Sequence, residues 1–242
     1  MKQSLVLLSG VLCDQSFWSD IPQRLSAVAQ VSVVSFGGFS SIAAMAQHVL
    51  RNAPDVFALA GHSMGGRVAL EVLRAEPRRV TGLALLNTGV HGVRDGEPQS
   101  RARLMRVAHE RGMSALAAEW LPSMMGSDAA RTAELMPALT AMIERSTTDA
   151  YADQMNAMLH RPEVMSMLAS IAVPTLLLSG SDDLSAPLSQ QQSILRRIPH
   201  ATLFEIHRAG HMAPLERPDS VVIALREWLL RLDTTGSPGA GQ

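Results

Sequence analysis

The sequence is poor in cysteine, lysine and aromatic residues. Among its 242 residues, Cys13 is the only cysteine and Lys2 the only lysine, and aromatic residues make up 4%. A single cysteine excludes an intrachain disulfide and fits a reducing compartment. We therefore expect a cytoplasmic protein whose fold does not depend on covalent cross-links.

The sequence also lacks a charge excess and a long hydrophobic run. Its formal net charge is −1 at pH 7, which argues against a basic surface for nucleic acid or anionic lipid. No stretch approaches the roughly 18 apolar residues of a membrane span. The apolar run in the N-terminal MKQSLVLLSG is only about five residues long, which favours a first strand over a signal peptide. We expect neither nucleic acid nor membrane as a partner, while the oligomeric state stays open.

Hydrophobic residues are abundant, at 47% against 18% charged, so one sizeable core can form without a metal. Short apolar runs bounded by turn residues predict buried strands of a parallel sheet. These runs span residues 5–8, 31–36, 56–60, 83–86, 175–178 and 203–206. Helical patterns between them, at 41–51, 64–75 and 218–232, predict an α/β fold with right-handed crossovers.

Residues 87–173 break this alternation, because they contain no convincing strand. The patches 101–111 and 114–121 have helical patterns, and ten of the 14 methionines lie between Met105 and Met167. We interpret this region as a helical cap folded over the carboxyl edge of the sheet. The predicted division is an α/β core of residues 1–89 and 171–233, a helical cap of residues 90–170, and a disordered tail of residues 234–242.

The segment GHSMGG follows the predicted strand 56–60 and precedes a helical pattern. Gly-x-Ser-x-Gly in this position predicts a nucleophile elbow, a tight turn that presents Ser63 above the sheet. Gly61 and Gly65 relieve the crowding because glycine has no Cβ. The N–H of Met64, at a helix N-terminus, is a predicted oxyanion donor. The alternative is a glycine-rich turn with an incidental serine.

A serine hydroxyl needs a base to act as a nucleophile at neutral pH. His211, in AGHMAPLERPD, lies between the last predicted strand and the final helix, and we predict it to be that base. His207, near the strand end, is the weaker candidate. His62, beside the serine, is interpreted as a packing residue.

Two carboxylates follow the predicted strand 175–178. We predict that Asp183, three residues after Gly180, orients the imidazole and stabilises its charged form, and that Asp182 forms the turn. The acid of such a site can also follow the preceding strand. Here the strand 83–86 is followed by Asn87 and Thr88, and neither residue is a carboxylate.

The loop after the first strand is expected to supply a second oxyanion donor. The N–H of Val11 is the predicted donor, and the N–H of Leu12 is the alternative. Cys13 follows in the same loop and is interpreted as a small buried hydrophobic residue rather than a reactive thiol.

Together, LLSGVLCDQSFW, GHSMGG, LLLSGSDDLSAP and AGHMAPLERPD resemble the α/β-hydrolase superfamily in order and spacing. The resemblance is to its compact bacterial branch of carboxylesterases, enol-lactonases and carbon–carbon bond hydrolases. It implies about six mostly parallel strands with a helical cap, and neither cofactor nor metal. Ser9-Gly10 stands where the family usually has His-Gly, so a supporting hydrogen bond is expected to differ.

The resemblance implies ester hydrolysis through an acyl-enzyme, and we expect a small, mainly uncharged ester as substrate. Two alternatives remain: an enol-lactonase or carbon–carbon bond hydrolase with the same triad, and a non-catalytic ligand-binding protein. Because thioethers line adaptable apolar pockets, the predicted substrate contacts are apolar. They are Leu12, Trp120, Met124 and Met125. Arg94, Arg101 and Arg103 form either a solvated helix face or a site for a substrate carboxylate.

Overall fold

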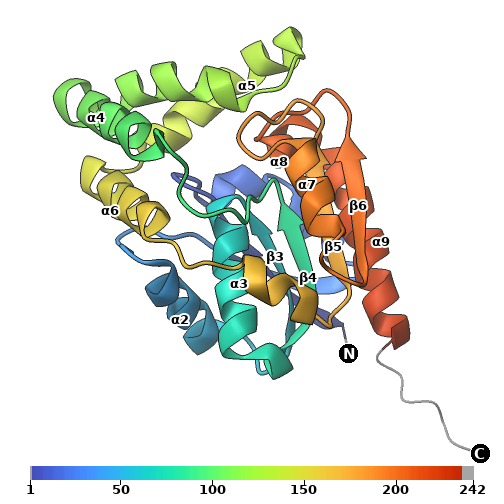
Figure 1. Ribbon diagram of the computed structural model, residues 1–242. Helices are drawn as coiled ribbons and strands as arrows, with labels where there is room; N and C mark the ends of the chain where they lie inside the picture. The colour runs from blue at the N-terminus through green and yellow to red at the C-terminus, as the bar shows by residue number, and fades with distance from the viewer. Residues whose placement is uncertain (1, 236–242) are drawn as a thin grey trace, which may run out of the picture.

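The computed structural model describes residues 2–235, in which helices cover both faces of one six-stranded sheet (Figure 1). The strand order is β2-β1-β3-β4-β5-β6, and all neighbouring strands are parallel. The strands are β1 (Gln3–Leu8), β2 (Ala29–Val34), β3 (Phe57–His62), β4 (Val80–Leu86), β5 (Thr175–Gly180) and β6 (Ala201–Ile206). The predicted fold class, with about six mostly parallel strands flanked by helices, is confirmed.

Helices connect these strands and fill the long interval between β4 and β5. The α-helices are α1 (Ile21–Leu25), α2 (Ile42–Asn52), α3 (Met64–Ala75), α4 (Glu97–Trp120), α5 (Ala129–Glu144), α6 (Thr148–Leu159), α7 (Leu188–Leu195), α8 (Ala213–Glu216) and α9 (Pro218–Thr235). Short 3₁₀ segments are η1 (Gln15–Trp18), η2 (Pro77–Arg79), η3 (Leu121–Met124) and η4 (Met165–Ser170).

Alternate residues of each strand enter two different cores. Leu5 and Leu7 of β1 pack in the cluster that contains α1 and α9, whereas Val6 and Leu8 pack in the cluster that contains α2 and α3. Successive side chains of a strand point to opposite faces. Burial on both faces therefore explains why the runs in β1, β3, β4 and β5 are almost continuously apolar, whereas the edge strands β2 and β6 are partly exposed and include polar residues.

The predicted strand ends are off by one to three residues in places, most at the start of β4, which begins at Val80 rather than at Leu83. Val56 was expected in the third strand, but it is 53% exposed and β3 begins at Phe57. At its other end β3 continues to His62, because Gly61 and His62 still pair with β4. Phe36 was placed in the second strand, which ends at Val34. The strand β3 thus leads directly into Ser63.

The interval 87–173 contains helices and no strand, as predicted. Figure 1 shows α4 and α5 beyond the carboxyl ends of the strands, with α6 beside the sheet between α4 and α2. Inside α4, Gly112 has a φ of 83°, which interrupts the helix between the two predicted helical patches. The exact division into a core and a cap of residues 90–170 stays a prediction.

The predicted tail of residues 234–242 falls outside the described residues from 236 onward. Residues 234 and 235 belong to α9, which extends beyond the expected end at Leu232. Within residues 2–235, no helix combines the length and apolar character that crossing a lipid bilayer requires.

Candidate active site

Ser63 occupies the single position between the end of β3 and the start of α3. Its φ of 53° and ψ of −113° are unusual for a residue with a side chain. A Cβ on Gly61 would overlap the backbone of Gly65, and a Cβ on Gly65 would overlap the backbone of Leu8. The two glycines of the motif are therefore required by close backbone approach, as the sequence predicts.

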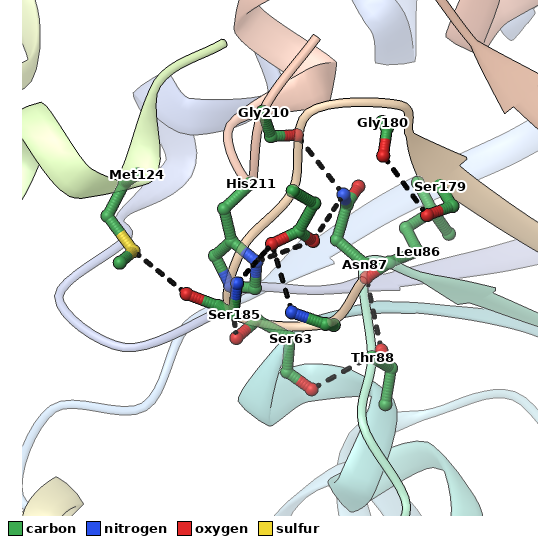
Figure 2. Close-up of polar contacts among 12 residues, drawn as sticks. Ser63, Leu86, Asn87, Thr88, Met124, Ser179, Gly180, Ser185, Gly210 and His211 are labelled. Atoms are coloured by element: carbon green, nitrogen blue, oxygen red, sulfur yellow. Dashed lines mark hydrogen bonds and ion pairs between the residues drawn. The ribbon is translucent and has the colours of Figure 1, made fainter. Parts of the chain in front are cut away.

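His211 contacts both Ser63 and Asp183, and Figure 2 shows its contact with Ser63. Its Nε2 is 2.8 Å from Oγ of Ser63, and its Nδ1 is 2.9 Å from Oδ2 of Asp183. The three side chains come from the turn after β3 and the loops after β5 and β6, which meet at the carboxyl edge of the sheet. This arrangement can transfer a proton from the serine hydroxyl to a carboxylate-oriented imidazole.

The carboxylate of Asp183 is buried and accepts several hydrogen bonds. Besides His211, its donors are the side-chain amide of Asn87 at 2.8 Å and the backbone N–H groups of Ser185 and Ala186 at 2.8 and 3.0 Å. Burial alone would raise the pKa of Asp183, but the charge and hydrogen bond of His211 and these donors lower it to about 2. The group is therefore ionised at neutral pH.

The neighbouring Asp182 has a different structural role. Its Oδ2 accepts a hydrogen bond from the N–H of Ser127 at 2.8 Å, and its Oδ1 accepts one from the hydroxyl of Ser181 at 2.8 Å. It stabilises the turn and connects it to the segment before α5, which agrees with its interpretation as a turn residue.

The loop after β1 passes beside Ser63. A Cβ added to Gly10 would lie 3.3 Å from the Cβ of Ser63, and Val11 lines the same cavity as the serine. The N–H of Leu12 already donates to Oε1 of Gln154 at 2.8 Å. Of the two oxyanion donors considered for this loop, the geometry therefore favours Val11. Met64 opens α3 immediately after the serine.

Ser9 supports this loop in a way that differs from the His-Gly pattern. The indole Nε1 of Trp18 donates to the Ser9 hydroxyl at 3.1 Å, and both residues are fully buried. Cys13 is also buried, and burial, assisted by the charge of Asp14, raises the pKa of its thiol. The burial of Cys13 and the raised pKa of its thiol agree with a packing role for this residue.

A cavity of about 530 Å³ opens at Ser63 and His211. Of the four predicted substrate contacts, Trp120 and Met124 line it. The other two were wrongly placed: Leu12, with a φ of 57°, and Met125 are both buried in the core and do not line this cavity. The sequence patterns identified apolar residues but not the direction of their side chains.

The polar end of the cavity was largely missed by the sequence analysis. Arg67, His91 and Arg161 line it together with the considered Arg94, Arg101 and Arg103. Only Arg67 carried a sequence signal, because it follows Ser63 by one helical turn. His91 and Arg161 lie in loops after β4 and α6, so only the tertiary fold brings them together.

The end of η3 and the residues that follow it are hydrogen-bonded to the loop that carries His211. The carbonyl oxygen of Met124 accepts a hydrogen bond from the N–H of His211 at 2.7 Å. Buried Glu216 accepts from the N–H groups of Gly126 and Gly210 at 2.8 and 2.9 Å. These bonds fix the backbone of His211 relative to the helices above the sheet.

The arrangement offers no obvious metal centre. Among the residues that the structure describes, no group of three or more His, Cys, Asp or Glu side chains lies close enough to hold a metal ion.

Comparison with known sequences identifies the family. The sequence profile described as "Alpha/beta hydrolase family" matches residues 5–225. This chain belongs to the alpha/beta hydrolase family. The family assignment confirms the resemblance drawn from the four motifs, and the matched range covers most of β1 and all of β2 to β6.

Curated relatives include several pimeloyl-[acyl-carrier protein] methyl ester esterases. The protein from Citrobacter koseri is 38% identical over 87 residues, which is 33% of this chain and 34% of that relative. The protein from Aromatoleum aromaticum is 24% identical over 93% of this chain and 98% of its own length. For the first relatives, such as the protein from Citrobacter koseri, the chain spans only about a third of the relative's length.

Solved structures with the same fold include an esterase and a lactonase. A thermophilic esterase from Thermogutta terrifontis has 25% identity and a TM-score of 0.85, covering 96% of this chain and 91% of the other. The enol-lactonase from Burkholderia xenovorans has 22% identity and a TM-score of 0.85, with 95% and 92% coverage.

The close approach of backbones at the elbow yields a stability prediction. Replacing Gly65 by alanine is expected to lower the free energy of unfolding by about 2 kcal/mol or more, because the new methyl group overlaps the backbone of Leu8. Gly37→Ala is the matched control, since nothing lies within 4 Å of its added Cβ, and its effect should stay within about 0.5 kcal/mol. Urea unfolding measures both, and equal stabilities would contradict the steric explanation.

The lowered pKa of Asp183 predicts a pH dependence of stability. The ionised group stabilises the fold above the ordinary value of 3.8, and this contribution is lost as the pH falls toward 2. The stability difference between the wild type and Asp183→Asn should therefore shrink by about 1 kcal/mol between pH 6 and pH 3. Urea unfolding at the two pH values measures it. Asp55→Asn, at an exposed position, should show no such change. A pH-independent difference for Asp183→Asn would refute the electrostatic explanation.

Proposed function

We propose that this protein is a serine hydrolase that cleaves small carboxylic esters through an acyl-enzyme. The observation that carries the proposal is the continuous contact from Ser63 through His211 to Asp183. Membership of the alpha/beta hydrolase family and the esterases among its relatives support the same reaction class.

In the first half of the reaction, His211 accepts the proton of Ser63 as Oγ attacks the ester carbonyl carbon. The negative charge that develops on the carbonyl oxygen is stabilised by the N–H groups of Met64 and Val11, and each donor contributes on the order of 3 kcal/mol. Asp183 stabilises the imidazolium that forms. His211 then protonates the alcohol as its bond to the acyl carbon breaks.

In the second half, His211 removes a proton from water, which attacks the acyl carbon of the ester formed with Ser63. Collapse of the second tetrahedral intermediate returns the proton to Ser63 and releases a carboxylic acid. The helices of the proposed cap, residues 90–170, limit access to the site, because Trp120 and Met124 line the cavity beside the serine and histidine.

Covalent labelling tests the proposed nucleophile. A fluorophosphonate probe should label the wild type and fail to label Ser63→Ala, because phosphonylation requires the activated hydroxyl. Ser123→Ala is the matched control: this serine lines the same cavity, but its hydroxyl only donates to the carbonyl oxygen of Trp120, so labelling should persist. Folded wild-type protein that stays unlabelled would refute the proposal and favour a non-catalytic ligand-binding protein.

Hydrolysis assays test the reaction class. Ser63→Ala should lower kcat for a short ester by up to about 10⁶-fold, by comparison with another serine hydrolase. A panel of esters, enol-lactones and carbon–carbon ring-cleavage products, assayed with the same enzyme, separates the esterase from the alternatives that would use the same triad. Higher kcat/KM on a lactone or a ring-cleavage product than on every ester would contradict the esterase assignment.

A further inference from the structure

Arg67 is a buried arginine at the wall of the proposed active-site cavity. It lies on α3 four residues after Ser63 and is only 4% exposed. Its Nη2 donates to the carbonyl oxygen of His91 at 2.6 Å, whereas its Nη1 is buried without a hydrogen-bond partner in the described chain. A buried donor that has lost water and gained no acceptor is unfavourable, so this atom calls for an explanation.

The half-buried carboxylate of Glu97, which lines the same cavity, is already paired with other arginines. Glu97 accepts from Nη1 and Nη2 of Arg161 at 2.7 Å each, and from Nε and Nη2 of Arg101 at 2.8 and 2.7 Å. Burial alone would raise the pKa of Glu97, but these donors lower it to about 2. Glu97 therefore serves two other guanidinium groups and forms no ion pair with Arg67.

The lining of the cavity as a whole has an excess of positive charge. Its five arginines are Arg67, Arg94, Arg101, Arg103 and Arg161, and its three carboxylates are Asp95, Glu97 and Glu119. Glu119 pairs with Arg103 and with Arg111. Burial first, and then the charge of Arg161, lower the pKa of Arg67 to about 9, as expected for a cation that lacks a counter-ion.

We propose that Arg67 binds a carboxylate that the substrate carries in addition to the ester bond at Ser63. The inference rests on the proposed function, because it names the substrate class of the same cavity. The hydrogen bond to His91 holds the guanidinium at the cavity wall, and one carboxylate oxygen of the substrate supplies the acceptor that buried Nη1 lacks. A singly charged carboxylate suits one open donor better than a phosphate, which offers more acceptor oxygens. This substrate class replaces the uncharged ester expected from the sequence.

Matched pairs of esters test this inference. The probes are the monomethyl esters of succinate, glutarate and adipate, each compared with its dimethyl ester at pH 7. The wild type should show a higher kcat/KM for the monomethyl ester of at least one chain length. Arg67→Met should lower that value on the order of tenfold to a hundredfold, and lower the value for the dimethyl ester far less, because only the anion loses a charged hydrogen bond.

Arg106→Met is the matched control, because Arg106 is an exposed arginine of α4 that does not line the cavity. It should keep the wild-type ratio of the two kcat/KM values. The wild-type comparison needs no variant, so a folding defect in Arg67→Met leaves the test intact. A wild type that prefers no monomethyl ester, as expected if water alone satisfies Nη1, would overturn the inference.

A binding measurement separates this inference from the proposed function. Titration calorimetry of the Ser63→Ala variant with the same monomethyl esters should give binding that Arg67→Met, added to this variant, abolishes. If the wild type is labelled by fluorophosphonate but neither binds nor prefers the anionic esters, the carboxylate site is wrong and the serine hydrolase stands. If Arg67-dependent binding is found without labelling, the carboxylate site stands and the hydrolase is wrong.

Discussion

The site depends on the close contact between two pieces of backbone, the turn that carries Ser63 and the loop after β1. Gly65 lies against the carbonyl of Leu8, and Gly10 lies against the imidazole of His62, next to Ser63, so neither position has room for a side chain. The positive φ of Ser63 persists because the hydrogen-bonded ends of β3 and α3 hold the turn from both sides. This single packing constraint aims the hydroxyl above the sheet and brings Val11 to the same cavity.

His211 is held in position by contacts from several directions. Asp183 contacts its Nδ1, and the carbonyl oxygen of Met124 accepts a bond from its N–H. Its own carbonyl oxygen lies 2.8 Å from Nε2 of buried His62. Burial, and then the proximity of His211, lower the pKa of His62 to about 3, so this second imidazole is neutral at physiological pH. His62 therefore acts as a packing and hydrogen-bonding residue, as the sequence suggests, and does not add a competing charge.

The parts of the site that follow a strand could be predicted from the sequence, and the parts that depend on side-chain direction could not. The Gly-x-Ser-x-Gly pattern, Asp183 and His211 each follow an apolar run, and the parallel sheet gathers such positions at one edge. Leu12 shows the limit, because its side chain turns into the core and its N–H binds Gln154, which is distant in sequence. Asn87 is a second example. The sequence shows that no carboxylate stands at this position, but it does not predict the hydrogen bond that the Asn87 side chain donates to Asp183.

The two ends of the cavity differ in how their charges are balanced. At the serine end, the charge of Asp183 is stabilised by four donor groups, so this end is complete without a ligand. At the arginine end, the carboxylate of Glu97 is also fully paired, but Nη1 of Arg67 is a buried donor without a hydrogen-bond partner among the described residues. An uncompensated buried cation destabilises the empty protein. Binding an anion removes that penalty, and because the guanidinium is already oriented by His91, little ordering is left to oppose binding. The imbalance thus favours an anionic group over a neutral one at the arginine end of the cavity.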